Sequence, residues 1–109
     1  MDNREVVARG IRFSETSEGV EIGRAYLYVL QNDSPRVFGL LEDVYVDELA
    51  RTSGVGRRLV EAVIARARKE GCYKLIATSR DDGTRQTVHA WYLRIGFRDY
   101  GKEFRMDLH

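Results

Sequence analysis

Cysteine and proline are nearly missing from this sequence of 109 residues, in which Cys72 is the only cysteine and Pro35 the only proline. A lone cysteine cannot form an intrachain disulfide, which excludes the small disulfide-stabilised domains of secreted proteins. No apolar stretch approaches the roughly 20 residues that cross a bilayer. The first residues also lack the basic and then apolar pattern of a signal peptide. We therefore expect a soluble, cytoplasmic protein with no membrane partner.

An excess of charge of one sign is missing too, since 18 Lys and Arg residues balance 17 Asp and Glu residues. The net charge of +1 gives no reason to expect a nucleic acid as partner. No group of Cys, His and carboxylate residues has the spacing of a metal site, so we expect no metal. The charges are unevenly placed, however, because an acidic segment at 40–49 precedes a basic segment at 51–69.

The residues that are present are those of a folded domain. Hydrophobic residues make up 43% of the chain, and its 10 glycines are spread along it. A chain of this length has room for one hydrophobic core. No repeat, linker or low-complexity stretch divides it. We therefore expect a single domain that spans residues 1–109.

Hydrophobic periodicity in the first part of the chain predicts strands. Residues 6–13, 20–30 and 37–46 are rich in β-branched and aromatic residues. Turn-forming residues at 14–19 and 32–35 separate them. The sequence therefore predicts three consecutive strands that are joined by short turns.

The period then becomes helical. Apolar residues from Val55 to Ala67 recur at helical spacing, and Gly71 would end that helix. Residues 73–78 are short and apolar, as in a strand buried on both faces.

A second helix would begin after Thr84 or Thr87 as its N-cap and stop at Gly96. Residues 97–108 would form one or two closing strands, with Gly101 at the turn. The order β-β-β-α-β-α-β(-β) predicts an α/β fold, in which helices cover the faces of a mixed sheet.

The segment from Arg51 to Arg58 lies between the third strand and the first helix. Gly54 and Gly56 let a ligand approach the backbone closely, and N–H groups at a helix start attract anions. Arg57 and Arg58 fall in the first helical turn, where the helix dipole disfavours cations. A bound polyanion would compensate for this placement. The alternative is a solvated turn with incidental arginines, and we favour the phosphate-binding loop.

Two motifs resemble those of the GCN5-related N-acetyltransferase (GNAT) superfamily. Residues 51–56, Arg-x-x-Gly-x-Gly, are similar to the loop that binds the pyrophosphate of acyl-CoA in that family. Residues 89–97, which end in Tyr-x-x-x-Gly-Phe, are similar to its later helix. Residues 41–46 resemble the strand before the loop in amine- and aminosugar-acetylating members, and 71–74 resemble glucosamine-phosphate acetyltransferases. The resemblance covers residues 36–109.

The resemblance implies a GNAT-like acyl-CoA N-acyltransferase fold and an acetyltransferase that uses acetyl-CoA in a ternary complex. The strands at 37–46 and 73–78 would splay apart, and the pantetheine arm would lie between them. Backbone N–H groups would hold the pyrophosphate and polarise the thioester carbonyl. The residues that the resemblance assigns to acetyl-CoA binding are Val44, Tyr45, Val46, Arg51, Ser53, Gly54, Val55, Gly56, Arg57 and Arg58.

The resemblance also suggests catalytic residues. Tyr92 matches the family's proton donor to the departing thiolate, although a core tyrosine on the apolar face of its helix is the alternative. Glu42 is the candidate base, acting through a water, and a solvated strand carboxylate is the alternative. Side chains alternate along a regular strand, so Glu42 and Asp43 point to opposite faces unless a bulge intervenes.

The acceptor is expected to be a small primary amine, such as an aminosugar or a polyamine. The acidic residues near the expected site would attract its charge; they are Glu42, Asp43, Asp47 and Glu48.

The family usually begins with a strand and two helices, and this sequence has no helical pattern before Val55. One sheet face and the edge near 6–13 would then be uncovered, so we expect a homodimer. The alternative function is a non-catalytic acyl-CoA-binding regulatory module on the same fold, which would need neither Glu42 nor Tyr92.

Overall fold

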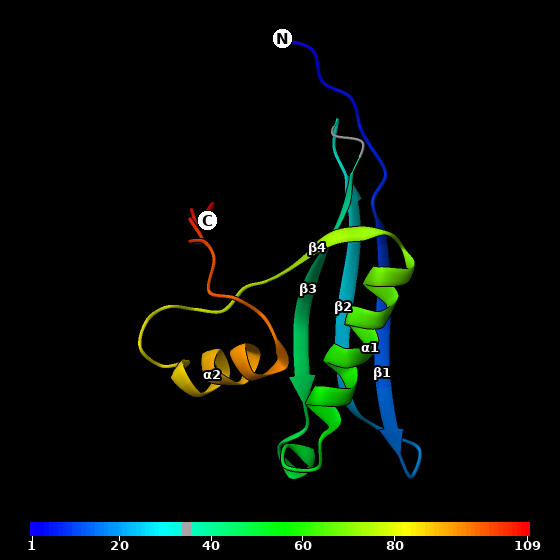
Figure 1. The fold of residues 1–109 in the computed structure, drawn as a ribbon, viewed down its shortest axis with the longest axis vertical. Helices are drawn as coiled ribbons and strands as arrows, with labels where there is room; N and C mark the ends of the chain where they lie inside the picture. Colours follow the sequence, from blue (N-terminus) through cyan, green and yellow to red (C-terminus); the bar gives the residue numbers. More distant parts are fainter. Residues whose placement is uncertain (34–35) are drawn as a thin grey trace. The chain divides into compact units, whose positions relative to one another are not determined.

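The computed structural model describes residues 1–33 and 36–109, which fall into two compact units, 1–77 and 78–109. The first unit holds a four-stranded sheet and one long helix, and the second holds one shorter helix (Figure 1). The predicted order β-β-β-α-β-α is confirmed. Of the predicted turn at 32–35, Ser34 and Pro35 lie outside the described residues.

Strands β1 (Arg9–Ser17) and β2 (Val20–Gln31) form an antiparallel hairpin. Its two-residue turn has positive φ at both positions, 52° at Glu18 and 78° at Gly19, which suits the right-handed twist of a hairpin. The prediction of a strand at 6–13 and a turn at 14–19 was therefore wrong in its bounds. The polar residues at 14–17 are strand residues, because the tight turn lets the ladder continue to its end.

Strands β3 (Val37–Val46) and β4 (Cys72–Ala77) complete a sheet of order β1-β2-β3-β4. β3 is antiparallel to β2 and parallel to β4. Parallel neighbours need a crossover connection, and here helix α1 (Val55–Lys69) supplies it. A 3₁₀ turn, η1 (Glu48–Ala50), lies between β3 and α1.

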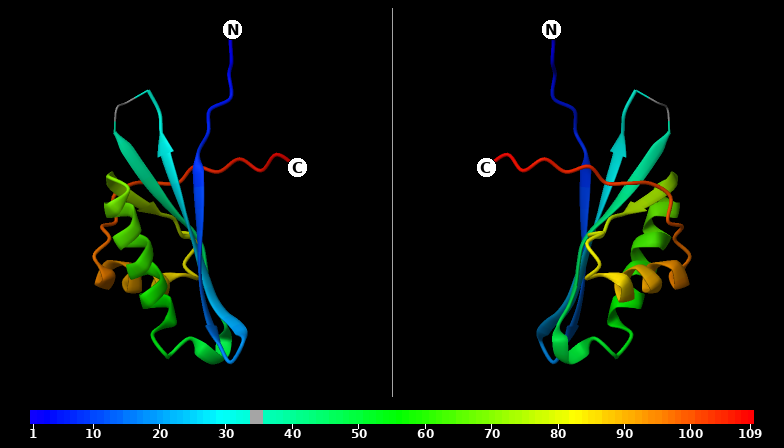
Figure 2. Two further views of the ribbon diagram at one scale, coloured as in Figure 1. Left: turned by 90° about the vertical axis from the view of Figure 1, so that its right-hand side faces the viewer. Right: turned by 90° about the vertical axis from the view of Figure 1, so that its left-hand side faces the viewer.

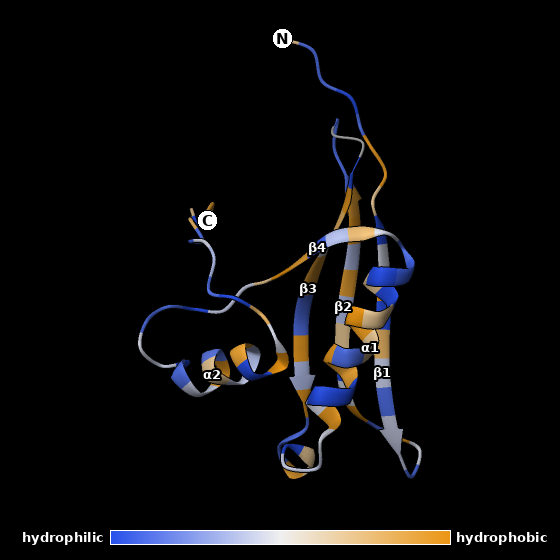
Figure 3. Cartoon of the chain, viewed as in Figure 1, coloured by the Kyte–Doolittle hydropathy of each residue, from blue (hydrophilic) through white to orange (hydrophobic). Residues whose placement is uncertain are grey.

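The hydrophobic core of the first unit lies between α1 and one face of the sheet. Figure 2 shows α1 along this face, and Figure 3 shows that apolar residues form the inner side of the helix. Gly71, at φ 80°, follows the helix and ends it as predicted. The buried apolar residues are Ala25, Leu27, Val29 and Leu41 of the sheet and Val55, Leu59, Val60, Val63 and Ala67 of the helix.

The opposite face of the sheet carries the alternate side chains of the strands. Cross-strand partners share a face, so Tyr26, Tyr28, Leu40 and Glu42 lie together on it. The rings of Tyr26 and Tyr28 are parallel, with centroids 6.0 Å apart. No helix of residues 1–33 or 36–77 covers this face (Figure 2).

The second unit contains helix α2 (Gln86–Ile95), which Gly96 ends. Its N-cap is Arg85, so the prediction of a threonine cap was wrong: the hydroxyl of Thr84 donates to Asp82 instead. The prediction of one or two closing strands at 97–108 was also wrong, since the structure has no strand in residues 97–109. A strand needs a hydrogen-bonding partner, and residues 78–109 contain no strand to pair with. No helix among the described residues is long and apolar enough to span a membrane.

Candidate active site

The connection from β3 to α1 is held by its own hydrogen bonds. The N–H of Asp47 donates to the carbonyl of Ile22 at 2.8 Å, which fixes the end of β3 against β2. The N–H and the hydroxyl of Ser53 both donate to the carbonyl of Ala50, at 3.1 and 2.5 Å. Arg51 donates from Nε to the carbonyl of Val46 at 3.0 Å. The Arg51 side chain therefore closes the loop instead of projecting freely from it.

The start of α1 is open to an anion. Gly54 is its N-cap, with φ 83°, and provides no side-chain oxygen for the first N–H groups. The first helical bond of this turn runs from the N–H of Arg58 to the carbonyl of Gly54, at 3.0 Å. The N–H groups of Val55, Gly56 and Arg57 precede it and have no acceptor within the helix. Together with the helix dipole, they form a site suited to phosphate oxygens.

The two arginines of the first turn already have carboxylate partners. Arg57 donates to Glu61 at 2.8 Å, and Arg58 donates to both oxygens of Glu15 at 2.9 and 2.5 Å. The hydrogen bond with Arg58 is the main cause that lowers the pKa of Glu15. Glu61 and Glu15 therefore already compensate for these cations, so the two arginines no longer argue for a bound polyanion, and phosphate binding stays a prediction. The open N–H groups remain as the argument for anion binding.

A β-bulge interrupts β3 just before the loop. Arg24 of β2 pairs with Tyr45, whereas Tyr26 pairs with Glu42, so β3 has one residue more than β2 between these pairs. Asp43 lies in the bulge with φ 49°, in the left-handed region. Its carboxylate accepts two hydrogen bonds from Arg24, whose partner Tyr45 lies on the face away from α1. The bulge therefore directs the carboxylates of both Glu42 and Asp43 to that face.

The two carboxylates differ in what they contact. Arg24 donates from Nε and Nη2 to Asp43, at 3.0 and 3.1 Å, and this hydrogen bonding lowers the pKa of Asp43. Glu42 is half-buried and has no ion-pair partner among residues 1–33 and 36–109. Arg24 occupies both oxygens of Asp43 and holds it in its charged form, whereas no arginine of the described residues holds the oxygens of Glu42. Glu42 is the better candidate for a base.

The backbone of β3 is unpaired on one side beyond the bulge. β4 pairs with the edge of β3 that faces away from β2, and this pairing ends at Leu41 and Ala77. Within the described chain, no strand pairs with the same edge at residues 42–46. On the other edge, Tyr45 and Val46 remain paired with β2. The pairing of β3 with β4 ends at Leu41 because β4 itself ends at Ala77, and the splaying of the two strands stays a prediction. Backbone groups of residues 44–46 lie on the unpaired edge, where the pantetheine arm was predicted.

Tyr92 belongs to the second unit, in the last turn of α2. Its ring makes edge-on contacts with Trp91 and Phe97, with centroids 5.1 and 5.3 Å away. Its carbonyl accepts hydrogen bonds from the N–H groups of Gly96 and Phe97. These contacts fit a packing role in the helix end, and the role of Tyr92 as a proton donor stays a prediction.

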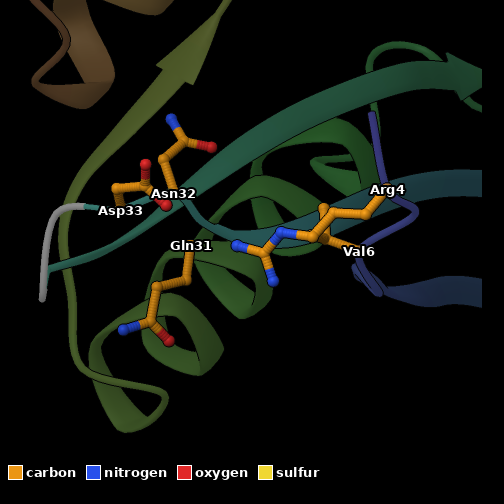
Figure 4. A pocket seen from close by; sticks show the side chains of 5 residues that line it. All are labelled: Arg4, Val6, Gln31, Asn32 and Asp33. Carbon is orange, nitrogen blue, oxygen red and sulfur yellow. The ribbon is translucent and has the colours of Figure 1, made fainter. Parts of the chain in front are cut away.

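The structure also has a hollow at the other end of the sheet (Figure 4). It measures about 280 Å³ and lies beside the end of β2 and the N-terminal segment. Its lining residues are Arg4, Val6, Gln31, Asn32 and Asp33. None of the predicted site residues is among them, and the loop at 51–58 follows the opposite end of β3.

The sequence reasoning missed Arg24. It placed this residue only within the strand predicted at 20–30. Its pairing with Asp43 depends on the bulge, which no periodicity in the sequence reveals. The signal that could have found it is a charged residue among the tyrosines of β2, opposite an acidic pair on β3.

Two curated proteins are similar to this chain in sequence. A glucosamine 6-phosphate N-acetyltransferase of Trypanosoma brucei brucei is 34% identical over 73 residues, which cover 67% of this chain and 46% of that protein. An aminoglycoside N(6')-acetyltransferase type 1 of Stenotrophomonas maltophilia is 36% identical over 96 residues, 86% of this chain and 61% of that protein. The chain thus spans about half the length of the first of these relatives.

A solved acetyltransferase structure from Trypanosoma brucei superposes with a TM-score of 0.78 at 29% identity. The match covers 93% of this chain and 69% of that one. The sequence pattern of the acetyltransferase (GNAT) family matches residues 9–97, which include the bulge, the loop and both helices. The chain belongs to the acetyltransferase (GNAT) family.

Proposed function

We propose that this protein transfers the acetyl group of acetyl-CoA to a primary amine of a small molecule. The observation that supports this most is the open start of α1 next to the unpaired edge of β3. The first offers N–H groups to a pyrophosphate, and the second offers backbone groups to an extended chain. A phosphate-containing ligand with an extended arm, such as acetyl-CoA, fits both.

The backbone of this chain would bind and orient the donor. The open N–H groups of Val55, Gly56 and Arg57 hold the pyrophosphate, and residues 44–46 hold the pantetheine arm on the free edge of β3. An N–H of that edge polarises the thioester carbonyl and stabilises the negative charge that forms during attack. Arg51 contributes by fixing the loop to Val46, and Arg57 and Arg58 support the first turn of α1.

Two side chains would move protons. The amine arrives as an ammonium, and Glu42 takes its proton through a water, so that the nitrogen lone pair can attack the carbonyl carbon. The bond between carbonyl carbon and sulfur then breaks, and Tyr92 donates its phenolic proton to the departing thiolate. Solvent returns a proton to Tyr92, and the Glu42 proton is released to water.

The acceptor is a cationic amine of the aminosugar or polyamine class. The acidic residues of β3 and the following turn give the site its negative charge, and Asp43 alone among them is neutralised by an arginine within the described residues. The names of the two curated relatives refer to an aminosugar phosphate and to aminoglycosides. Both classes carry primary amines.

The assembly is proposed to be a homodimer. The sheet face away from α1 has no helix from residues 1–33 or 36–77 over it, and it carries half-exposed tyrosines. Uncovered apolar surface of this kind favours association. The single domain at 1–109 and the cytoplasmic location stay predictions.

The experiment that tests the function is release of free thiol from acetyl-CoA with a panel of amines. Turnover with glucosamine 6-phosphate, an aminoglycoside or spermidine, and none with the corresponding alcohols, is the expected result. Calorimetric binding of acetyl-CoA without turnover of any amine would instead indicate the non-catalytic acyl-CoA-binding module. Absence of binding would contradict both functions.

A further inference from the structure

The bulge of β3 places an aspartate in a conformation that most residues avoid. Asp43 has φ 49°, and only it and Glu18 have positive φ among the non-glycine residues that the structure describes. Glu18 lies in a hairpin turn that demands this conformation. Asp43 lies within a strand, where the extended conformation is favoured. Something must therefore favour the left-handed conformation at this position.

Arg24 contacts both sides of the bulge. It donates to both carboxylate oxygens of Asp43, at 3.0 and 3.1 Å. Its guanidinium also lies 4.8 Å from the ring centroid of Tyr45. Asp43 precedes Val44 and Tyr45 follows it, so one planar side chain from β2 holds the residues on both sides of Val44. Such a fork restrains orientation as well as distance.

We propose that the ion pair of Arg24 and Asp43 holds the bulge of β3 in the geometry that acetyl transfer requires. Both are positioning residues: they touch no reacting atom and act through the backbone of Val44 and Tyr45. This inference rests on the proposed function, in which that backbone binds the pantetheine arm and polarises the thioester. A small displacement of an N–H that must point at the carbonyl oxygen lowers the rate steeply.

If the ion pair served only to stabilise the fold, its loss would lower the melting temperature and leave turnover unchanged. A positioning pair should do the reverse. The side chain of Asp43 is 55% exposed and that of Arg24 is 31% exposed, and exposed pairs contribute little to the stability of a fold. Loss of this pair should therefore leave the melting temperature nearly unchanged. A change in turnover without a change in stability is the signature of positioning.

The first test is Arg24→Gln, with Glu21→Gln as the matched control. Glu21 accepts two hydrogen bonds from Arg12, at 2.6 and 2.8 Å, in another exposed pair of the same sheet. That pair joins β1 and β2, and its hydrogen bonds within the described residues go to Tyr26 and Glu21 of β2, not to β3. We expect Arg24→Gln to lower kcat by ~10-fold or more, with an acetyl-CoA Kd within about threefold of wild type because the pyrophosphate loop is intact. Glu21→Gln should keep the wild-type rate.

The second test is rescue by glycine. Glycine adopts positive φ without steric cost, so Asp43→Gly removes the need for the ion pair. The double variant Arg24→Gln with Asp43→Gly should recover a rate within about threefold of wild type. Arg24→Gln with Asp43→Ala should stay at least ~10-fold slow, because alanine disfavours that conformation. Equal rates for these two double variants would overturn the inference.

The inference and the proposed function fail in different ways. If wild type turns over amines and Arg24→Gln is equally fast, the inference is wrong and the function stands. If wild type turns over no amine, the function is wrong. In that case NMR of the ligand-free protein tests the inference through the backbone amide signals of Val44 and Tyr45. These signals should shift in Arg24→Gln but not in Glu21→Gln, and unchanged signals would overturn the inference.

Discussion

A Cβ atom built on Gly23 would lie only 2.8 Å from Cγ1 of Val55, and 2.9 Å from Cδ1 of Leu59. Gly23 is in β2, and Val55 begins α1, so the first turn of the helix packs directly on the backbone of the sheet. This contact sets how closely the start of α1 approaches the strands that carry the bulge.

Replacement of Gly23 by alanine should therefore destabilise the protein. The added methyl group overpacks two fully or nearly buried side chains, which typically costs about 1–3 kcal/mol. Thermal unfolding should show a fall in melting temperature of at least about 4 °C. Gly101→Ala is the control, because a Cβ there has no neighbour within 4 Å. Equal melting temperatures for the two variants would contradict the tight contact.

A bulky residue at Gly54 should abolish binding of acetyl-CoA. Gly54 has φ 83° and lies at the start of α1, so a β-branched side chain both strains the turn and covers the open N–H groups. At a concentration about 100 times Kd, the ligand should stabilise wild type by ~2.7 kcal/mol. Gly54→Val should lose this gain. Gly71→Val carries similar backbone strain, at φ 80°, after the opposite end of α1, and should keep it.

Replacement of Glu42 by glutamine should slow the chemical step. Glutamine keeps the size of the side chain but cannot take a proton, and a general base typically contributes ~10²–10⁴-fold. Steady-state thiol release should show this loss in kcat. Glu5→Gln, at an exposed position of the N-terminal segment, is the control and should have little effect. A loss of less than about threefold in Glu42→Gln would leave water as the base.

Acid should destabilise the fold through Glu70. This carboxylate accepts hydrogen bonds from Arg9 and Arg66, and these bonds lower its pKa from 4.5, with Arg9 the largest cause. Because the folded pKa is lowered, the stabilisation is present above pH 4.5 and is lost as the pH falls through the folded value. Urea unfolding at pH 7, 5, 4 and 3 should show a smaller decline in Glu70→Gln than in wild type. Glu103→Gln, at an exposed position, should decline like wild type.

The helices could be predicted from sequence because their signals are local. The apolar residues from Val55 to Ala67 recur at helical spacing, and Gly71 and Gly96 follow the two helix ends. Gly54 was predicted as a position where a ligand approaches the backbone, which stays a prediction; its φ of 83° shows in addition that the turn before α1 favours glycine. In each case a few neighbouring residues contain the whole pattern.

The bulge and its ion pair could not be predicted, since they depend on contacts between strands. Arg24 and Asp43 are 19 residues apart, and only the register of β2 against β3 brings them together. The alternation rule alone placed Glu42 and Asp43 on opposite faces, whereas the extra residue in β3 brings both to one face. The partners of Arg57 and Arg58 were missed in part for the same reason, because Glu15 lies on β1.

Residues 97–108 show the opposite error, because the sequence predicted strands that the structure does not contain. Residues 103–108 alternate between charged and apolar side chains, which is typical of a strand, yet the structure has no strand there. Its apolar residues are exposed, with Phe104 at 91% and Leu108 at 83%. Alternation indicates only that a segment can form a strand when a partner strand lies beside it, and residues 78–109 contain no such partner strand.

Tyr92→Phe tests whether the second unit takes part in the chemistry. Phenylalanine keeps the ring and its contacts with Trp91 and Phe97, so the fold of α2 should be preserved. Tyrosine phenols carry their proton at neutral pH, and loss of a general acid typically costs ~10²–10⁴-fold. We therefore expect kcat to fall by at least ~10²-fold, while calorimetry gives an acetyl-CoA Kd close to that of wild type.

The matched control for Tyr92→Phe is Tyr100→Phe, which removes the hydroxyl of an exposed tyrosine in the same unit. It should leave both kcat and Kd unchanged. The loss in Tyr92→Phe should also be smaller with a donor whose thiol is more acidic than that of CoA, because a better leaving group needs less help from an acid. If Tyr92→Phe turns over within a factor of about two of wild type, where a lost general acid costs ~10²-fold or more, Tyr92 only packs α2. The thiolate would then leave with a proton from solvent.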